Sequence, residues 1–299
     1  MGVVTASSKW IASALWPAEP AKGHASGWPA SEAPLTKGKG GDIASDQWQR
    51  GTDEKPYDVV SRTGKSILFN CGTKGSLDRA KWALAKEPGT ISWIDSFEPE
   101  STFWDIGANV GVFALYAAIE RSCIVTAFEP AASNFAALSR NIVLNGLDRQ
   151  VRALPVAIDA RCKVSDMHMV DDNEGSALHV FGSDIDYTGK RFTASHLQGA
   201  IGLSIDALVS TFGLAIPNHI KIDVDGLERD VVMGGAATFA SPACQSVLVE
   251  LDLNDAHEVK AISDILSNCG MSRDETIKGN TPRPHPNALV YNMIFRRLG

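Results

Sequence analysis

The chain has 299 residues, of which 44% are hydrophobic and 21% charged, and its formal net charge is -7. This composition is typical of globular proteins, and the acidic balance argues against a general nucleic-acid-binding protein. No apolar run approaches the roughly 18 residues that span a bilayer. The five cysteines form no CxxC pair, which favours reduced thiols in a cytoplasmic protein over a disulfide framework.

The N-terminal part of the chain is predicted to consist of two segments. Residues 1–57 form a flexible low-complexity leader, because the stretch from about Trp16 to Lys55 is rich in Ala, Gly, Pro, Ser and Lys and shows no helical or strand period. Residues 58–100 form an extension packed on the core. It contains a strand or hairpin over 58–70 and a helix over 76–87, which begins with a plausible N-cap.

From Ser101 onward, short β-branched runs alternate with helical runs. Strands are expected over 103–107, 124–130, 151–158, 219–225, 246–252 and 287–297, the last paired with a strand near 271–275. Helices are expected over 110–121, 133–145, 205–212, 227–239 and 254–270. This alternation predicts an α/β fold with a doubly wound, mostly parallel sheet. The strands are nearly all apolar, which indicates that helices cover both faces of the sheet.

The stretch FWDIGANVGVF, residues 103–113, lies where the first strand of this sheet meets its helix. Ligands of open α/β sheets bind at this edge, and Gly107 and Gly111 allow unusual backbone angles and close approach by a ligand. Asp105 at the strand tip would repel a dinucleotide pyrophosphate but attract a cation. S-adenosylmethionine (SAM) carries a sulfonium and an α-ammonium group and no phosphate. Asp105 therefore favours SAM over NAD.

The second strand ends in Glu129 and Pro130, a little over 20 residues beyond Gly107. An acid at this strand tip is well placed to accept hydrogen bonds from both hydroxyls of a ribose, as in other nucleoside-binding sheets. Together, the two acids indicate a SAM site.

These motifs resemble those of class I SAM-dependent methyltransferases and, more narrowly, of the FkbM family. The resemblance rests on DIGANVGVFALYAA, AFEPAASNFAALSRNIVLNG, LSIDALV, HIKIDVDGLERDVVMGGA and VLVELD, with AKEPGTISWIDSF, EGSALHVFG and NMIFRR as further familial runs. It covers about residue 58 to the C-terminus. It implies a seven-stranded Rossmann-like methyltransferase sheet with an antiparallel C-terminal strand, and O-methylation of a hydroxyl on a sugar, glycan or other small-molecule acceptor. Residues 101–299 would then be the SAM-binding methyltransferase domain, with an insertion at about 162–202 that shapes the acceptor site.

The resemblance also assigns residues to the cofactor. It implies that the methionine end of SAM is lined by Asp105, Gly107, Ala108, Asn109 and Gly111. The ribose would be bound by Glu129 and Pro130, and the adenine would be bordered by Ala157, Ile158 and Asp159.

Candidate catalytic residues lie at the tip of the fourth strand. Lys221, Asp223 and Asp225 share one face if the pairing is regular. Asp223 is the first candidate for the base or for orienting the acceptor, with Lys221 and Glu250 as neighbours. His179, inside the insertion, is the second candidate base.

Several alternatives stay open. An NAD(P)-dependent Rossmann oxidoreductase is disfavoured by Asp105 and by the missing third glycine. The presence of Asp105, Glu129 and Asp223 argues against a non-catalytic SAM-fold scaffold or regulatory protein. The strand tip DVDG lacks the proline and aromatic residue that base-flipping methyltransferases use. No metal-ligand spacing is present, so no metal is expected. The acceptor and the oligomeric state, including a homodimer, are not determined by the sequence.

Overall fold

The computed structural model describes residues 56–277, 279–285 and 288–297, which belong to one compact unit, Asp46–Gly299. The predicted leader lies almost entirely outside these residues. No helix in the described part is both long enough and apolar enough to cross a membrane.

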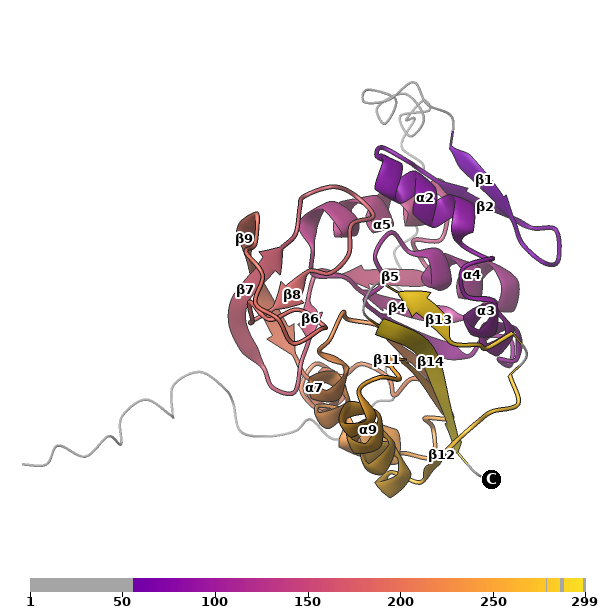
Figure 1. Ribbon diagram of the computed structural model, residues 1–299. Helices are drawn as coiled ribbons and strands as arrows, with labels where there is room; N and C mark the ends of the chain where they lie inside the picture. Colours follow the sequence, from indigo (N-terminus) through magenta and orange to yellow (C-terminus); the bar gives the residue numbers. More distant parts are fainter. Residues whose placement is uncertain (1–55, 278, 286–287, 298–299) are drawn as a thin grey trace, which may run out of the picture. The chain divides into compact units, whose positions relative to one another are not determined.

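A central sheet organises the described chain (Figure 1). Its strand order is β12 (Met271–Arg273), β14 (Ala288–Arg297), β11 (Ser246–Asp252), β10 (His219–Ile222), β3 (Thr102–Ile106), β4 (Ile124–Phe128) and β5 (Val151–Leu154). Strands β11, β10, β3, β4 and β5 run parallel, β14 pairs antiparallel with β11 and β12, and the short β13 (Arg283–His285) pairs with β14 outside this path. The predicted mostly parallel seven-stranded sheet with an antiparallel C-terminal strand is confirmed.

Helices cover both faces of this sheet (Figure 1). They are α2 (Lys74–Trp82), α3 (Pro88–Asp95), α4 (Val112–Arg121), α5 (Ala132–Leu144), α6 (Ile205–Ser210), α7 (Glu228–Met233), α8 (Ala236–Ala240) and α9 (Ala256–Asn268). Side chains alternate along a strand, so neighbouring residues enter different cores. Phe103 of β3 packs in the cluster that contains α3 and α4, whereas Trp104 and Ile106 pack in the cluster that contains α7 and α9.

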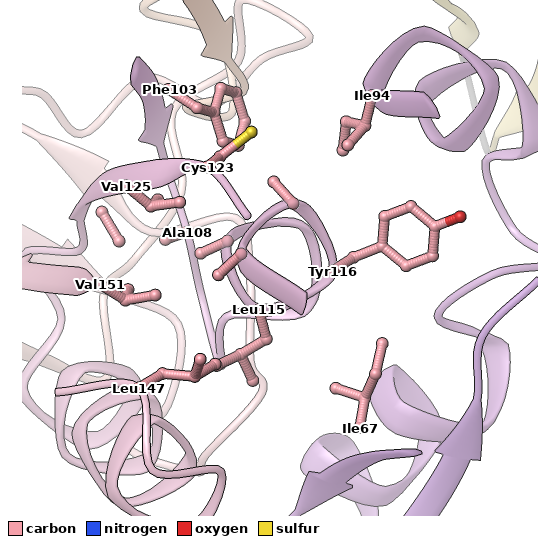
Figure 2. Close-up of a cluster of buried hydrophobic side chains, with 14 of the residues drawn as sticks. Ile67, Ile94, Phe103, Ala108, Leu115, Tyr116, Cys123, Val125, Leu147 and Val151 are labelled. Carbon is pink, nitrogen blue, oxygen red and sulfur yellow. The ribbon is translucent and has the colours of Figure 1, made fainter. Parts of the chain in front are cut away.

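Helix α4 fixes the first strand of the site. Figure 2 shows Leu115 and Tyr116 pointing to different sides of α4, the first toward Leu147 and the second toward the space between Ile67 and Ile94. The helix thereby joins the sheet to the N-terminal extension. Burial of large side chains on both sides stabilises this arrangement by about 1.5–3 kcal/mol for each fully buried side chain.

The N-terminal extension differs in part from the prediction. Strands β1 (Tyr57–Val60) and β2 (Ser66–Phe69) form the expected antiparallel hairpin. Helix α2 begins at a capping box between Thr73 and Ser76, slightly before the predicted start, and ends at Trp82. The chain then enters α3, which the sequence analysis did not anticipate. Pro88 occupies the first position of α3, where a missing N–H costs nothing.

Two predicted elements are divided. The expected strand over 151–158 stops at Pro155, which has no N–H for the ladder. The last residues of the expected strand form β6 (Ala157–Ile158), which belongs to a second sheet. The other strands of this sheet are β7 (Lys163–Met169), β8 (Val180–Phe181) and β9 (His196–Leu203), and the strand order is β6-β9-β7-β8. The expected helix over 227–239 becomes α7 and α8, separated by Gly234 and Gly235. A Cβ on Gly234 would lie 2.5 Å from the Asp159 carbonyl oxygen, so glycine permits this close packing.

Candidate active site

A cavity of about 750 Å³ lies at the carboxyl ends of the parallel strands. Gly107, Glu129 and Asp223, which follow β3, β4 and β10, line it together with Glu250 of β11. Residues of the insertion between Ser176 and Gly189 also contribute to the lining. This volume falls in the range of small-molecule sites.

A second cavity of about 460 Å³ adjoins the first. Helix α2, the segment after it and the turn between β3 and α4 form its walls. Five residues line both cavities: Arg79, Lys86, Gly107, Asn109 and Asp223. The two spaces therefore meet beside the tips of β3 and β10.

The turn after β3 depends on glycine for two different reasons. Gly107 has φ +81°, and a Cβ there would lie 1.8 Å from the Asp223 carbonyl oxygen, so the turn packs directly against the tip of β10. Gly111 has φ +94° and lines neither cavity. A Cβ there would lie 2.6 Å from Leu138 Cδ1, which gives Gly111 a packing role against α5. Asn109 lines both cavities, and Ala108 lines only the second.

The Glu129 carboxylate is held in place by the backbone. Its Oε2 accepts a hydrogen bond from Asn109 N at 2.8 Å, and its Oε1 accepts one from Ala131 N at 2.9 Å. Burial raises the pKa of Glu129 to about 7, although these backbone donors offset part of the rise. Each carboxylate oxygen has a further lone pair, so Glu129 can still accept hydrogen bonds from a ligand.

The residues expected around the adenine divide into two groups. Ala157 and Ile158 line the first cavity, as does Pro130 near the ribose position. Asp159 does not line either cavity, because its Oδ2 pairs with Lys163 Nζ at 2.7 Å. The structure therefore does not favour contact between Asp159 and a ligand.

Asp105 lies beneath the cavity floor. It is fully buried, lines neither cavity, and stands opposite Lys221 in the pairing of β3 with β10. Burial raises its pKa to about 6, while Lys221 and the nearby backbone of Ala114 offset part of the rise. Neither carboxylate oxygen makes a hydrogen bond of standard geometry within the described chain. Its negative charge raises the pKa of Lys221, and its contact with the methionine end of SAM stays a prediction.

Lys221 connects Asp105 to the cavity. Its side chain is 1% exposed, and Nζ lies 2.6 Å from Asp223 Oδ2 and 4.8 Å from the centre of the Phe113 ring. Burial is the largest single influence and raises the pKa of Asp223, but the charge of Lys221, its hydrogen bond and the charges of Lys86 and Arg79 together outweigh burial and lower this pKa to about 2. Asp223 therefore stays ionised at neutral pH and is a weak base.

Glu250 has the opposite tendency. Burial, together with the negative charges of Asp223 and Glu87, raises its pKa well above the ordinary value, although Arg283 pairs with its carboxylate. Sequence reasoning missed Glu87 and Arg283. Glu87 precedes the first strand of the domain and Arg283 lies near the C-terminus, so no local spacing connects them.

Asp223, Glu250 and Glu87 form a cluster whose carboxylate oxygens lie within 4.8 Å of one another. Such a cluster could bind a divalent cation, but Lys221 and Arg283 already place two positive charges on it. That no metal is required stays a prediction.

Asp225 and His179 link the strand tip to the insertion. Asp225 Oδ2 accepts a hydrogen bond from Leu178 N at 2.7 Å. His179 Nδ1 accepts one from Val170 N at 3.1 Å, so the neutral ring carries its proton on Nε2. Burial also lowers the pKa of His179. This arrangement does not favour His179 as a base, although its ring lines the first cavity.

The comparison with known proteins agrees with this architecture. The family model described as "Methyltransferase FkbM domain" matches residues 105–272, more than half of the chain. A hexuronic acid methyltransferase, AglP, from Haloferax volcanii is 26% identical over 61% of this chain and 68% of its own length. The 31-O-demethyl-FK506 methyltransferase FkbM from Streptomyces tacrolimicus is 27% identical over 46% of this chain and 60% of its own length.

Among solved structures, methyltransferase FkbM from Methylobacillus flagellatus KT has a TM-score of 0.44 and 10% identity, covering 67% of this chain and 44% of that one. TYW2 from P. horikoshii in complex with MeSAdo has a TM-score of 0.43 and 11% identity, covering 81% and 71%. The family match extends from the tip of β3, through the parallel strands that build the cavity, to β12. The chain belongs to the FkbM methyltransferase family and is a methyltransferase of that type.

Proposed function

We propose that this protein is a SAM-dependent O-methyltransferase that acts on a hydroxyl of a sugar, glycan or other small-molecule acceptor. The observation that carries the cofactor assignment is the Glu129 carboxylate, fixed by two backbone N–H groups beside the Gly107 turn. This geometry suits a ribose whose two hydroxyls donate to one carboxylate.

The remainder of the first cavity fits the charge of SAM. Besides Glu129, its lining contains Asp223, Asp225, Glu228 and Glu250. Such an acid-rich space attracts a molecule that carries a sulfonium and an ammonium group. When bound, SAM supplies a methyl group on a positively charged sulfur. Gly107 and Asn109 would border its methionine end, and Pro130, Ala157 and Ile158 its nucleoside end.

The acceptor hydroxyl must lose its proton as its oxygen bonds to the methyl carbon and the carbon–sulfur bond breaks, with the electron pair of that bond going to sulfur. We assign the proton to Glu250, because its raised pKa makes it the stronger base of the two acids at the rim. Asp223, held by Lys221, would orient the acceptor by accepting a hydrogen bond from a neighbouring hydroxyl of the same molecule. Positioning of this kind contributes several kcal/mol to the barrier reduction.

The relatives support oxygen on a sugar or other small molecule as the acceptor. One is named for a hexuronic acid, and the other for the 31-O-demethyl form of a small molecule. Neither name describes a nucleic acid, and the net charge of -7 agrees with a small-molecule acceptor.

Calorimetric titration with SAM tests the cofactor assignment. We expect micromolar binding by the wild-type protein and at least a tenfold loss in Glu129→Gln, since hydrogen bonds to a charged group contribute about 1.5–3 kcal/mol. Glu120→Gln is the matched control, because among the described residues Glu120 accepts a hydrogen bond only from Thr63, on the surface. Failure of folded wild-type protein to bind SAM, or binding of NAD in its place, would overturn the proposal.

A further inference from the structure

Helix α2 and the segment that follows it, called the α2 wall below, carry two basic side chains that line the second cavity. Arg79 is half-buried, and its Nε donates to the Gly175 carbonyl oxygen at 3.1 Å. Within the described ranges, no carboxylate forms an ion pair with Arg79. Lys86 is exposed, and its ion pair with Glu87 is long, at 4.0 Å. Both side chains line both cavities, so their charges face the place where the two spaces meet.

The strand tips opposite this wall are acidic. Burial is the largest influence on the pKa values of Asp223 and Asp225 and raises both, while Arg79 and Lys86 act in the opposite direction on each. The two basic residues are therefore close enough to Asp223 and Asp225 to lower the pKa values of both acids. A carboxylate in this space is attracted to the α2 wall and repelled from the strand tips.

The remaining lining of the second cavity contains two acids, Asp78 and Glu87, and the buried Lys221, beside several apolar side chains. Ala83, Val112 and Phe113 contribute to it, and Trp82 stands at the wall with 61% of its surface exposed. An exposed tryptophan offers a large flat surface with a polar N–H, which can pack against the C–H face of a ring and donate a hydrogen bond. This wall thus combines a flat apolar surface with two cations, with Asp78 and Glu87 beside them.

We propose, on the basis of the methyl transfer proposed above, that the second cavity binds the acceptor and selects a sugar that carries a carboxylate. The carboxylate pairs with Arg79 and Lys86, the ring packs on Trp82, and a hydroxyl faces Asp223 and Glu250. Arginine suits this role because the two terminal nitrogens of its guanidinium match the two oxygens of a carboxylate. The cavity would thereby orient the acceptor by its charge, with the anionic end away from the reacting end.

Two matched probes test this selection. p-Nitrophenyl β-D-glucuronide and p-nitrophenyl β-D-glucoside differ in one carboxylate, and their binding to protein saturated with S-adenosylhomocysteine can be followed by calorimetry and saturation-transfer NMR. We expect the wild type to bind the glucuronide about tenfold more tightly or better. Lys86→Ala and Arg79→Gln should each remove most of this preference. Lys81→Ala should keep this preference. Lys81 is an exposed base on α2, like Arg79, but its side chain lines neither cavity. Lys86 is exposed, so its variant should fold even if Arg79→Gln does not.

Equal binding of the two probes by the wild type would overturn the inference. In a second experiment, SAM and decarboxylated SAM are titrated into the same variants. This determines whether Arg79 and Lys86 bind the carboxylate of the acceptor or that of SAM. Unchanged SAM affinity supports the acceptor assignment. Loss of SAM affinity, with decarboxylated SAM unaffected, assigns Arg79 and Lys86 to the methionine carboxylate and overturns it. Failure of the wild type to bind SAM at all would instead defeat the proposed function.

Discussion

The two halves of the strand edge are built in different ways. At the tips of β3 and β4, Gly107, Asn109 and Glu129 lie within about 25 residues of one another and are joined mainly through backbone groups. At the tips of β10 and β11, Asp223 pairs with Lys221, and Glu250 pairs with Arg283, which comes from near the C-terminus.

We infer that this difference separates cofactor binding from chemistry. Backbone hydrogen bonds and a glycine turn give a rigid, preformed cradle, as a cofactor common to many enzymes requires. Ion pairs between side chains set the protonation states of acids, as a proton transfer requires. Substitutions in the first half should therefore change mainly the affinity for SAM and the stability. Substitutions in the second half should change mainly turnover and its pH dependence.

The sharpest test of this division is Glu250→Gln. Because we assign the proton of the acceptor to Glu250, turnover should fall by about 10²–10⁴-fold while the SAM dissociation constant stays within about twofold. Steady-state kinetics on a sugar-acid acceptor, with calorimetry of SAM binding, measure both quantities. Asp223→Asn should lower turnover less steeply and weaken acceptor binding. If Asp223→Asn has the larger effect on turnover and Glu250→Gln has little, the two roles are reversed.

Gly107→Ala tests the contact between the two halves. The new methyl group would lie 1.8 Å from the Asp223 carbonyl oxygen at a backbone φ of +81°. Overpacking and backbone strain together should lower the free energy of unfolding by roughly 2–5 kcal/mol, as measured by urea denaturation. Gly64→Ala is a matched control, because Gly64 has φ +85° and open space around it. It should lose only about 1 kcal/mol, and equal losses in both variants would show that the close contact is unimportant.

The sequence predicted the first half well, because its information is local. Asp105, Gly107 and Glu129 follow buried strands at recognisable spacings, and parallel strands bring such tips together. The depth of Asp105 was missed, as were the positions of Gly111 and Asp159, which line neither cavity. The place of Asp105 directly opposite Lys221 depends on the pairing of β3 with β10, which are more than 100 residues apart.

The second half could be predicted only in part. Lys221, Asp223 and Glu250 were identified from strand tips, but Glu87 and Arg283 lie outside the alternating pattern, and nothing in their local sequence marks them. The position of α2 was missed for the same reason, since its basic residues gain meaning only beside the β3 turn. Periodicity identifies elements, whereas packing between distant segments decides which charges meet.

The pH dependence of stability should follow the carboxyl groups whose pKa values are shifted by burial and by neighbouring charges. The pKa of Asp105 is raised from 3.8 to about 6 and that of Glu129 from 4.5 to about 7. Protonation of both acids therefore favours the folded state, and this stabilisation is complete below about pH 4 and lost as pH rises through 6 and 7. Asp223 acts in reverse, because its lowered pKa gives stability that is present above pH 3.8 and lost as pH falls toward 2.

Urea unfolding of the SAM-free protein should accordingly show greater stability at pH 5 than at pH 8. Between pH 5 and the folded pKa of about 6 lies about one pKa unit, so at 1.36 kcal/mol for each unit Asp105 alone contributes about 1.4 kcal/mol to this difference. Asp105→Asn should flatten the profile between pH 4 and 7. A profile that rises from pH 5 to 8 in the wild type would contradict the charge balance described for the first half.

The smallest expected effect comes from Thr90, whose hydrogen bonds hold Glu87 beside the tips of β10 and β11. Thr90 Oγ1 donates to Glu87 Oε2 at 3.0 Å and accepts from Asn292 Nδ2 at 2.7 Å, and all three residues are buried. Thr90→Val keeps the shape but removes the hydroxyl, so the free energy of unfolding should fall by about 1.5 kcal/mol. Thr63→Val provides the comparison, because Thr63 donates a hydrogen bond to Glu120 at an exposed position, and this variant should lose less than about 0.5 kcal/mol.

Since Glu87 is one of the charges that raise the pKa of Glu250, Thr90→Val should also shift the pH profile of turnover while leaving SAM affinity unchanged. A shift in SAM affinity without a shift in that profile would place Glu87 in the binding half of the edge.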